Sequence, residues 1–236
     1  HRMRYMEFRS PARLLLSRWI TVLLIRLMIP APSAALATTY YYGERKNDRI
    51  FLFPPILRRE VLSCKPTIGT HHLVYVTSHF EHLLELLKTF PERQFVVYGC
   101  QRQGVDGNLS YRPFSTEGFL RDLESCQSVL ATAGFTLISE AIYLGKPYLA
   151  LPMAGQFEQQ LNAICLEELG FGVNARRADR AALSDFFECL PSLQARVAAY
   201  AAEHRLTGQR DANAAIKRKL DMLLTEELLT QDAQAC

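Results

Sequence analysis

Two short turns, each following an apolar strand-like run, carry the side chains of this chain that are best suited to binding a ligand. The first turn follows "SVLAT" and reads Thr132-Ala133-Gly134-Phe135-Thr136 before a helix begins. Small residues let the backbone approach a ligand closely, and the free N–H groups and positive dipole of a helix N-terminus suit a phosphate. The first turn therefore predicts phosphate binding.

An acidic residue follows this turn inside the same expected helix. Glu140 lies six residues after Gly134, and a carboxylate at this spacing can accept two hydrogen bonds from a ribose diol, as in dinucleotide folds. A plain strand–turn–helix with an exposed Glu140 is the alternative, and spacing alone does not separate the two. The G-x-G-x-x-G fingerprint is absent, so a nicotinamide cofactor is not favoured.

The second turn, "GQFEQQLNA", follows the apolar run "YLALP". It places Gln156, Glu158 and Gln159 at the next helix start and Asn162 one turn later. Planar acids and amides donate and accept hydrogen bonds in the way that sugar hydroxyls require. Taken singly, each residue is typical of a helix cap or a solvated surface. Beside the first turn, they predict a sugar site next to a nucleotide site.

Short apolar strands alternate with helices from His72 onward, and this alternation indicates the elements that must position the two turns. We expect strands at 72–77, 94–99, 109–114, 128–132, 148–152 and 171–175, and helices at 80–90, 115–124, 134–144, 158–169 and from Asp179 to about Leu229. Such alternation predicts an α/β fold with a doubly wound parallel sheet flanked by helices. Ligands bind beyond the carboxyl ends of such strands, so both turns should open onto one crevice.

Composition argues against several other classes of function. The chain has 236 residues, 49% of them hydrophobic, and a net charge of only +3, with no Lys/Arg tract interleaved with aromatics, so nucleic-acid binding is not expected. None of the six cysteines forms a C-x-x-C pair, which favours reduced thiols. Four histidines (71, 72, 79 and 82) lack a Cys or acid at a recognised spacing, so we expect neither a metal nor a cofactor.

The chain before His72 has a different texture. Pro54-Pro55 is a stiff break, and we place an interdomain linker at residues 54–70. Near the N-terminus, basic residues, the run "LLLSRWITVLLIRLMIP" and small residues leave three interpretations open: a packed helix of a truncated first domain, a membrane-surface helix, and a signal or anchor segment. Arg18 and Arg26 interrupt the apolar run, which argues against a membrane-spanning helix.

The segment "TAGFTLISEAIYLGKPYLALPMAGQFEQQLNA" resembles the nucleotide-sugar donor site of GT-B glycosyltransferases. It is similar to the signature of UDP-glycosyltransferases and to MurG, the GlcNAc transferase of peptidoglycan synthesis. It most resembles a MurG-like family of bacteria and archaea, in which "PPILRREV", "VYVT" and "EQQLNA" have counterparts. The resemblance covers about residues 50–175 and is strongest over 128–163.

By position, the resemblance implies a role for each turn. Thr132, Gly134, Phe135 and Thr136 would line the donor phosphates, Glu140 would hold the ribose, and Glu158 and Gln159 would face the donor sugar. Gln156 would also belong to the donor site. Arg112 to Phe114 would contact the base, and Thr77, Ser78 and His79 would flank the diphosphate. The chain departs from the pattern at Thr132, where many members have His, and at "VTSHF", which replaces a glycine-rich loop. No D-x-D occurs, in agreement with metal-independent chemistry.

The resemblance implies a glycosyltransferase that moves a hexosyl or N-acetylhexosaminyl group from a UDP-sugar to an acceptor. It implies the tail of an N-terminal acceptor domain at 1–53, the linker at 54–70, and a donor-binding domain with C-terminal helices at 71–236. The missing acceptor domain or a partner subunit would supply the acceptor site and general base. We expect a cytoplasmic protein, with peripheral contact at the inner membrane face. The alternatives are a non-catalytic nucleotide-sugar-binding subunit of a split transferase and a UDP-sugar 2-epimerase.

Overall fold

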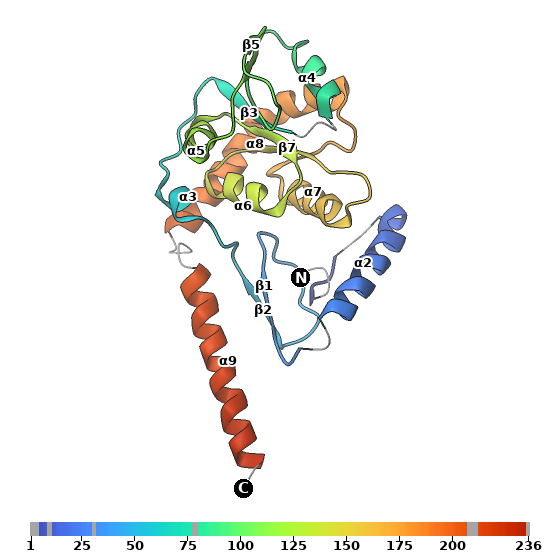
Figure 1. Ribbon diagram of the computed structural model, residues 1–236, viewed down its shortest axis with the longest axis vertical. Coiled ribbons are helices and arrows are strands. Elements are labelled where there is room, and N and C mark those ends of the chain that lie inside the picture. Colours follow the sequence, from blue (N-terminus) through green and yellow to red (C-terminus); the bar gives the residue numbers. More distant parts are fainter. Residues whose placement is uncertain (1–4, 9–10, 30–31, 77–79, 207–211, 235–236) are drawn as a thin grey trace. The chain divides into compact units, whose positions relative to one another are not determined.

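The computed structural model describes residues 5–8, 11–29, 32–76, 80–206 and 212–234 (Figure 1). The chain divides into two compact units. The N-terminal unit comprises His1–Ile56 together with Gly208–Cys236, and the sheet unit comprises Leu57–Thr207. Each unit is described by itself.

The sheet unit contains seven strands whose order identifies the fold class. The strands are β3 (His71–Tyr75), β4 (Gln94–Tyr98), β5 (Gly104–Asp106), β6 (Leu109–Tyr111), β7 (Val129–Thr132), β8 (Tyr148–Leu151) and β9 (Gly172–Asn174), in the spatial order β5-β6-β4-β3-β7-β8-β9. All neighbours pair in parallel except the edge pair β5–β6. Without β5, this is the doubly wound order 3-2-1-4-5-6, which reverses between β3 and β7.

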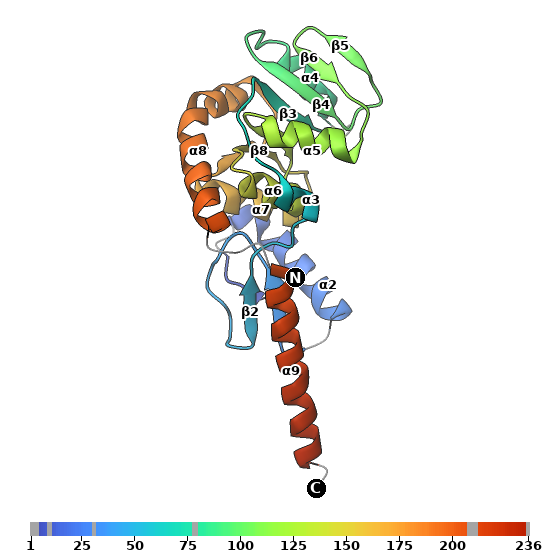
Figure 2. The same ribbon diagram turned by 90° about the vertical axis from the view of Figure 1, so that its left-hand side faces the viewer.

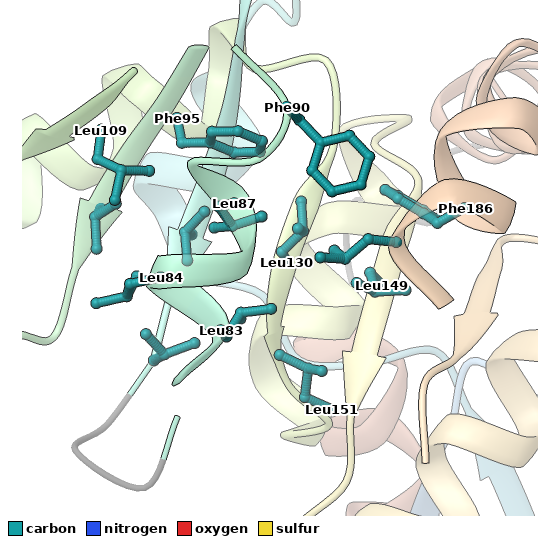
Figure 3. Packing of buried hydrophobic residues seen from close by; sticks show 14 of the residues in the cluster. Leu83, Leu84, Leu87, Phe90, Phe95, Leu109, Leu130, Leu149, Leu151 and Phe186 are labelled. Atoms are coloured by element: carbon teal, nitrogen blue, oxygen red, sulfur yellow. The ribbon is translucent and has the colours of Figure 1, made fainter. Parts of the chain in front are cut away.

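Helices cover both faces of this sheet. They are α3 (Arg59–Ser63), α4 (Glu81–Leu87), α5 (Thr116–Ser125), α6 (Phe135–Tyr143), α7 (Phe157–Leu169) and α8 (Arg180–Leu206) (Figure 2). Figure 3 shows Leu84 and Leu87 of α4 and Phe186 of α8 packed with Leu130 and Leu149 of the strands. Adjacent strand residues point to opposite faces.

The opposite face of the sheet carries α5. Val74 of β3 lies in the core with α4, whereas the next residue, Tyr75, contacts Phe119 of α5, with ring centroids 5.5 Å apart. Tyr98 of β4 meets the same ring at 5.2 Å. Successive residues of the strands are therefore buried on both sides, which explains their continuous apolar runs.

The strands and helices expected from His72 onward are confirmed, and two elements were not predicted: the short helix α3, inside the expected linker, and the edge strand β5. Ser115 caps α5 by accepting a hydrogen bond from the Gly118 N–H at 3.0 Å, and Gly170, at φ +70°, ends α7. Residues 104–106, expected to be loop, form the antiparallel edge strand β5. All three are exposed, so this strand carries no apolar pattern by which the sequence could reveal it.

The N-terminal unit consists of η1 (Ala12–Leu14), α2 (Leu15–Met28), the parallel pair β1 (Ala35–Thr38) and β2 (Ile50–Phe53), and the long helix α9 (Ala212–Gln234). The ammonium of Lys219 lies 4.0 Å from the centroid of the Phe51 ring, so α9 packs on β2. The division at Ile56 falls inside the expected linker, and α9 groups with the N-terminal unit and not with the sheet unit. Among the described helices, none is long and apolar enough to span a membrane.

Candidate functional site

The first turn lies at the point where the strand order reverses. β7 ends at Thr132 and α6 begins at Phe135, with Gly134 in the N-cap position. The Gly134 N–H donates to the Thr132 carbonyl at 2.7 Å, which makes the turn tight. A Cβ atom added at Gly134 would meet no heavy atom within 4 Å, so the backbone here faces open space.

The second turn lies beside the first at the same edge of the sheet. β7 and β8 are parallel neighbours with Thr132 opposite Leu151, so the segments that follow them leave the sheet together. Asn162 of α7 joins the two: its amide is fully buried, and Nδ2 donates to the Ala133 carbonyl at 2.8 Å. Asn162 thus holds the first turn in place from the second helix.

The polar side chains of the second turn are arranged by local hydrogen bonds. Gln159 accepts a hydrogen bond from the Met153 N–H at 3.1 Å through Oε1, and its Nε2 donates to Oε1 of Gln156 at 2.6 Å. Gln156 and Glu158 are exposed, whereas Phe157 between them is buried and anchors the start of α7. The predicted sugar-facing residues are therefore brought together at one helix start.

Glu140 is buried and paired, not exposed. Its side chain is 3% exposed, and both of its oxygens accept hydrogen bonds from Arg58: Nε donates to Oε1 at 2.7 Å and a terminal nitrogen donates to Oε2 at 2.9 Å. The hydrogen bonds to Glu140 are the largest of the causes that raise the pKa of Arg58. Arg58 was not among the predicted site residues, although it lies in the "PPILRREV" segment that carries the resemblance.

The residues that follow β6 combine an ion pair with an exposed ring. Arg112 donates from one terminal nitrogen to both oxygens of the buried Asp122, at 2.6 Å each, and the Tyr98 hydroxyl donates to the same carboxylate at 2.6 Å. Burial, followed by Asp122, raises the pKa of Tyr98 to about 12. Phe114 is 60% exposed and lies 5.7 Å from Phe119 between ring centroids. The Arg112 guanidinium is thus occupied, whereas the Phe114 ring remains available to a planar ligand.

Fewer contacts describe the remaining predicted site residues. Phe135 is half-buried and Thr136 is exposed, both in the first turn of α6. Thr77, Ser78 and His79 lie outside the described residues. Within the part of the chain that the structure describes, no group of three or more His, Cys, Asp or Glu side chains could hold a metal ion.

A mostly parallel α/β sheet flanked by helices is the fold of GT-B glycosyltransferases, and the small-residue turn of this chain lies at the reversal point of that sheet. The family described as Glycosyl transferase family 1 matches residues 1–191, and the chain belongs to this family. A search of curated proteins finds no match.

Solved structures show the same fold at low sequence identity. Spinosyn forosaminyltransferase SpnP is 16% identical with a TM-score of 0.56, over 89% of this chain and 63% of its own. The glycosyltransferase SsfS6 of Streptomyces sp. SF2575, complexed with thymidine diphosphate, is 19% identical with a TM-score of 0.51. The match covers 89% of this chain and 60% of SsfS6. The glycosyltransferase of kitacinnamycin is 18% identical with a TM-score of 0.53, and the match covers 72% of this chain and 51% of that protein. The chain thus spans between half and two thirds of these neighbours.

Proposed function

We propose that this chain is the donor-binding half of a glycosyltransferase that takes a UDP-sugar and transfers its hexosyl or N-acetylhexosaminyl group without a metal ion. One observation carries the proposal: the turn from Thr132 to Thr136 follows β7 at the point where the sheet order reverses. Doubly wound sheets bind nucleotides at this point, and the N-terminus of the helix that begins there favours phosphate.

The side chains around the turn fit the other parts of such a ligand. Glu140 would serve the ribose, the amides of Gln156 and Gln159 with Glu158 would serve the sugar, and the exposed Phe114 ring would stack on the base. The neighbour SsfS6 was solved with thymidine diphosphate, which supports a pyrimidine nucleoside diphosphate as the ligand class. We choose uridine because the donor-site segment resembles that of UDP-glycosyltransferases.

Calorimetric titration of UDP, thymidine diphosphate and UDP-GlcNAc in EDTA tests this proposal. We expect UDP to bind at a single site and more tightly than thymidine diphosphate. EDTA should not weaken the binding of UDP. Gly134→Leu is the informative variant, because Gly134 has φ −71° and open space at its Cβ, so a side chain fits the fold but fills the expected phosphate position.

Gly134→Leu should weaken UDP binding by more than tenfold, while Ala181→Leu, an exposed small-to-large change in the first turn of α8, should bind like the wild type. Circular dichroism checks that both variants fold. A Gly134→Leu variant that binds UDP as tightly as Ala181→Leu would place the nucleotide elsewhere, and a requirement for Mg²⁺ or Mn²⁺ would contradict the metal-independent mechanism.

We also propose that the roles of the two units are divided. Residues 1–53 would be the tail of an acceptor-binding domain, and the general base would come from that domain or from a partner subunit. The purified chain should then bind UDP and transfer nothing to an acceptor. Sustained acceptor glycosylation by the chain alone would contradict this division.

Helix α2 supports a cytoplasmic protein that touches the inner membrane face. Its exposed apolar side chains include Trp19 at 64% and Leu27 at 72%, and the segment from Phe8 to Gly43 contains no acidic residue. Burial, followed by the charges of Arg18 and Arg26, lowers the pKa of Lys46, so these three basic side chains lie near one another. Apolar and basic side chains together favour anionic lipid.

Flotation with vesicles tests this contact. The chain should float with phosphatidylglycerol-containing vesicles and not with pure phosphatidylcholine, and Trp19→Ser should reduce the floating fraction severalfold. Equal flotation with both lipids would contradict the preference for anionic lipid, and a stable dimer that hides Trp19 would show that α2 packs against protein instead.

A further inference from the structure

We propose that Arg58 is a positioning residue of the donor site, which orients the carboxylate of Glu140 and ties the segment entering the sheet unit to helix α6. This inference rests on the proposed function, because it deepens the role of Glu140 as the ribose-binding residue. It adds a residue that acts through Glu140 rather than on the ligand.

The geometry of the pair restricts the carboxylate to one orientation. Two parallel hydrogen bonds, of 2.7 and 2.9 Å, join the guanidinium edge to both oxygens of Glu140. A single hydrogen bond would let the carboxylate rotate about its last torsion, whereas the paired contact fixes its plane. Only the planar fork of arginine makes this contact, and lysine can hold the charge but not the plane.

The pair leaves hydrogen-bonding capacity on the carboxylate. A carboxylate offers about four lone-pair sites, and the two hydrogen bonds from Arg58 use about two of them. The unused sites can accept the two hydroxyls of a vicinal diol. Because Arg58 fixes the plane, these sites have a set direction before the ligand arrives, which lowers the cost of ordering on binding.

Packing alone gives little reason for a buried ion pair at this position. The neighbouring α6 residues Ile138, Ala141 and Ile142 are apolar and nearly fully buried, so an apolar side chain at position 140 would continue the same surface. Replacing a buried ion pair by apolar residues of similar volume is often neutral or stabilising. The Arg58–Glu140 pair is therefore better explained by its fixed orientation than by its contribution to stability.

The position of Arg58 in the chain adds a second consequence. Arg58 lies two residues after the division at Ile56 and immediately before α3, while Glu140 lies 82 residues further on in α6. The Pro54-Pro55 break precedes it. The ion pair therefore fastens the start of the sheet unit to the helix that carries the proposed ribose-binding residue.

Discrimination between UDP and 2′-deoxy-UDP tests the inference, because it reports the ribose contact separately from overall affinity. Both nucleotides are titrated calorimetrically into the wild type, Arg58→Met, Arg58→Lys and Arg59→Met. Arg59 is the matched control, since it is the adjacent arginine and is exposed. We expect the wild type and Arg59→Met to prefer UDP about tenfold, as loss of one charge-assisted hydrogen bond implies.

In Arg58→Met this preference should fall to about twofold, with weaker UDP binding, and Arg58→Lys should lie between because it keeps the charge without the fork. If Arg58→Met does not fold in urea titrations, Arg58→Lys decides. Full tenfold preference in folded Arg58 variants would overturn the inference and leave the proposed function standing. Failure of the wild type to bind either nucleotide would overturn both.

Discussion

The energetics of the Arg58–Glu140 pair can be worked out from the unequal exposure of its two members. The carboxylate is 3% exposed and the guanidinium 38%. Removing one partner of a fully buried pair costs about 3–5 kcal/mol, because the other charge is left without a partner. In Arg58→Met the uncompensated group is the buried carboxylate, so we expect a loss of about 2–4 kcal/mol after allowing for the partly solvated guanidinium.

The reverse substitution should cost less. In Glu140→Leu the group left over is Arg58, which already reaches water, so the loss should be about 1–2 kcal/mol. The double variant Arg58→Met/Glu140→Leu removes both charges and should lie within about 1 kcal/mol of the wild type. Adding Glu140→Leu to Arg58→Met should therefore restore most of the stability that Arg58→Met loses.

Urea unfolding followed by circular dichroism measures these differences. The one tryptophan, Trp19, belongs to the N-terminal unit, so its fluorescence provides a separate signal from the unit without the substitutions. Arg59→Met is the control and should change stability by no more than about 0.5 kcal/mol. Equal losses for Arg58→Met and Arg59→Met, or a double variant less stable than Arg58→Met, would refute the reasoning.

Three further predictions concern the sheet unit. Burial, followed by Arg93 and His71, lowers the pKa of His72 to about 3. As pH falls from about 6.5 toward 3, the unfolded chain therefore binds a proton at His72 that the folded chain does not bind. The free energy of unfolding should drop by about 2 kcal/mol between pH 7 and 5 for this reason. In His72→Leu this part of the pH dependence should be missing from urea titrations, and an unchanged pH dependence would contradict the prediction. Asn162→Leu leaves the buried Ala133 carbonyl without the hydrogen bond from Asn162, so the sheet unit should lose about 1–3 kcal/mol of stability in the same assay. Unchanged stability would contradict this prediction. Ser115→Ala removes the cap of α5 and should lower stability by about 1 kcal/mol, whereas Ser115→Asp should retain it.

Local pattern was sufficient to predict the framework of the site. The apolar runs before Thr132 and Pro152, and the small residues after the first of them, predict strand, turn and helix because each signal acts over a few neighbouring residues. The same holds for the cap at Ser115 and the helix end at Gly170, where one side chain or one φ angle decides the outcome.

Parts of the fold without such a signal escaped prediction. The edge strand β5 is three exposed residues long, and its pairing with β6 is made by backbone groups that any residue possesses. The grouping of α9 with residues 1–56 depends on which part of the protein the helix packs against. Hydrophobic periodicity shows which face of a helix is apolar but not which element covers that face.

The sequence by itself determined that a tight, small-residue turn opens α6 and that Glu140 lies in that helix. Only the tertiary structure decided that both oxygens of Glu140 are held by Arg58, that Arg112 is occupied by Asp122, and that Asn162 supports the turn at Ala133. These partners are between 10 and 82 residues apart. A charged or amide side chain pairs with whatever the packing of strands and helices brings within about 3 Å of it, and no short-range pattern encodes that distance.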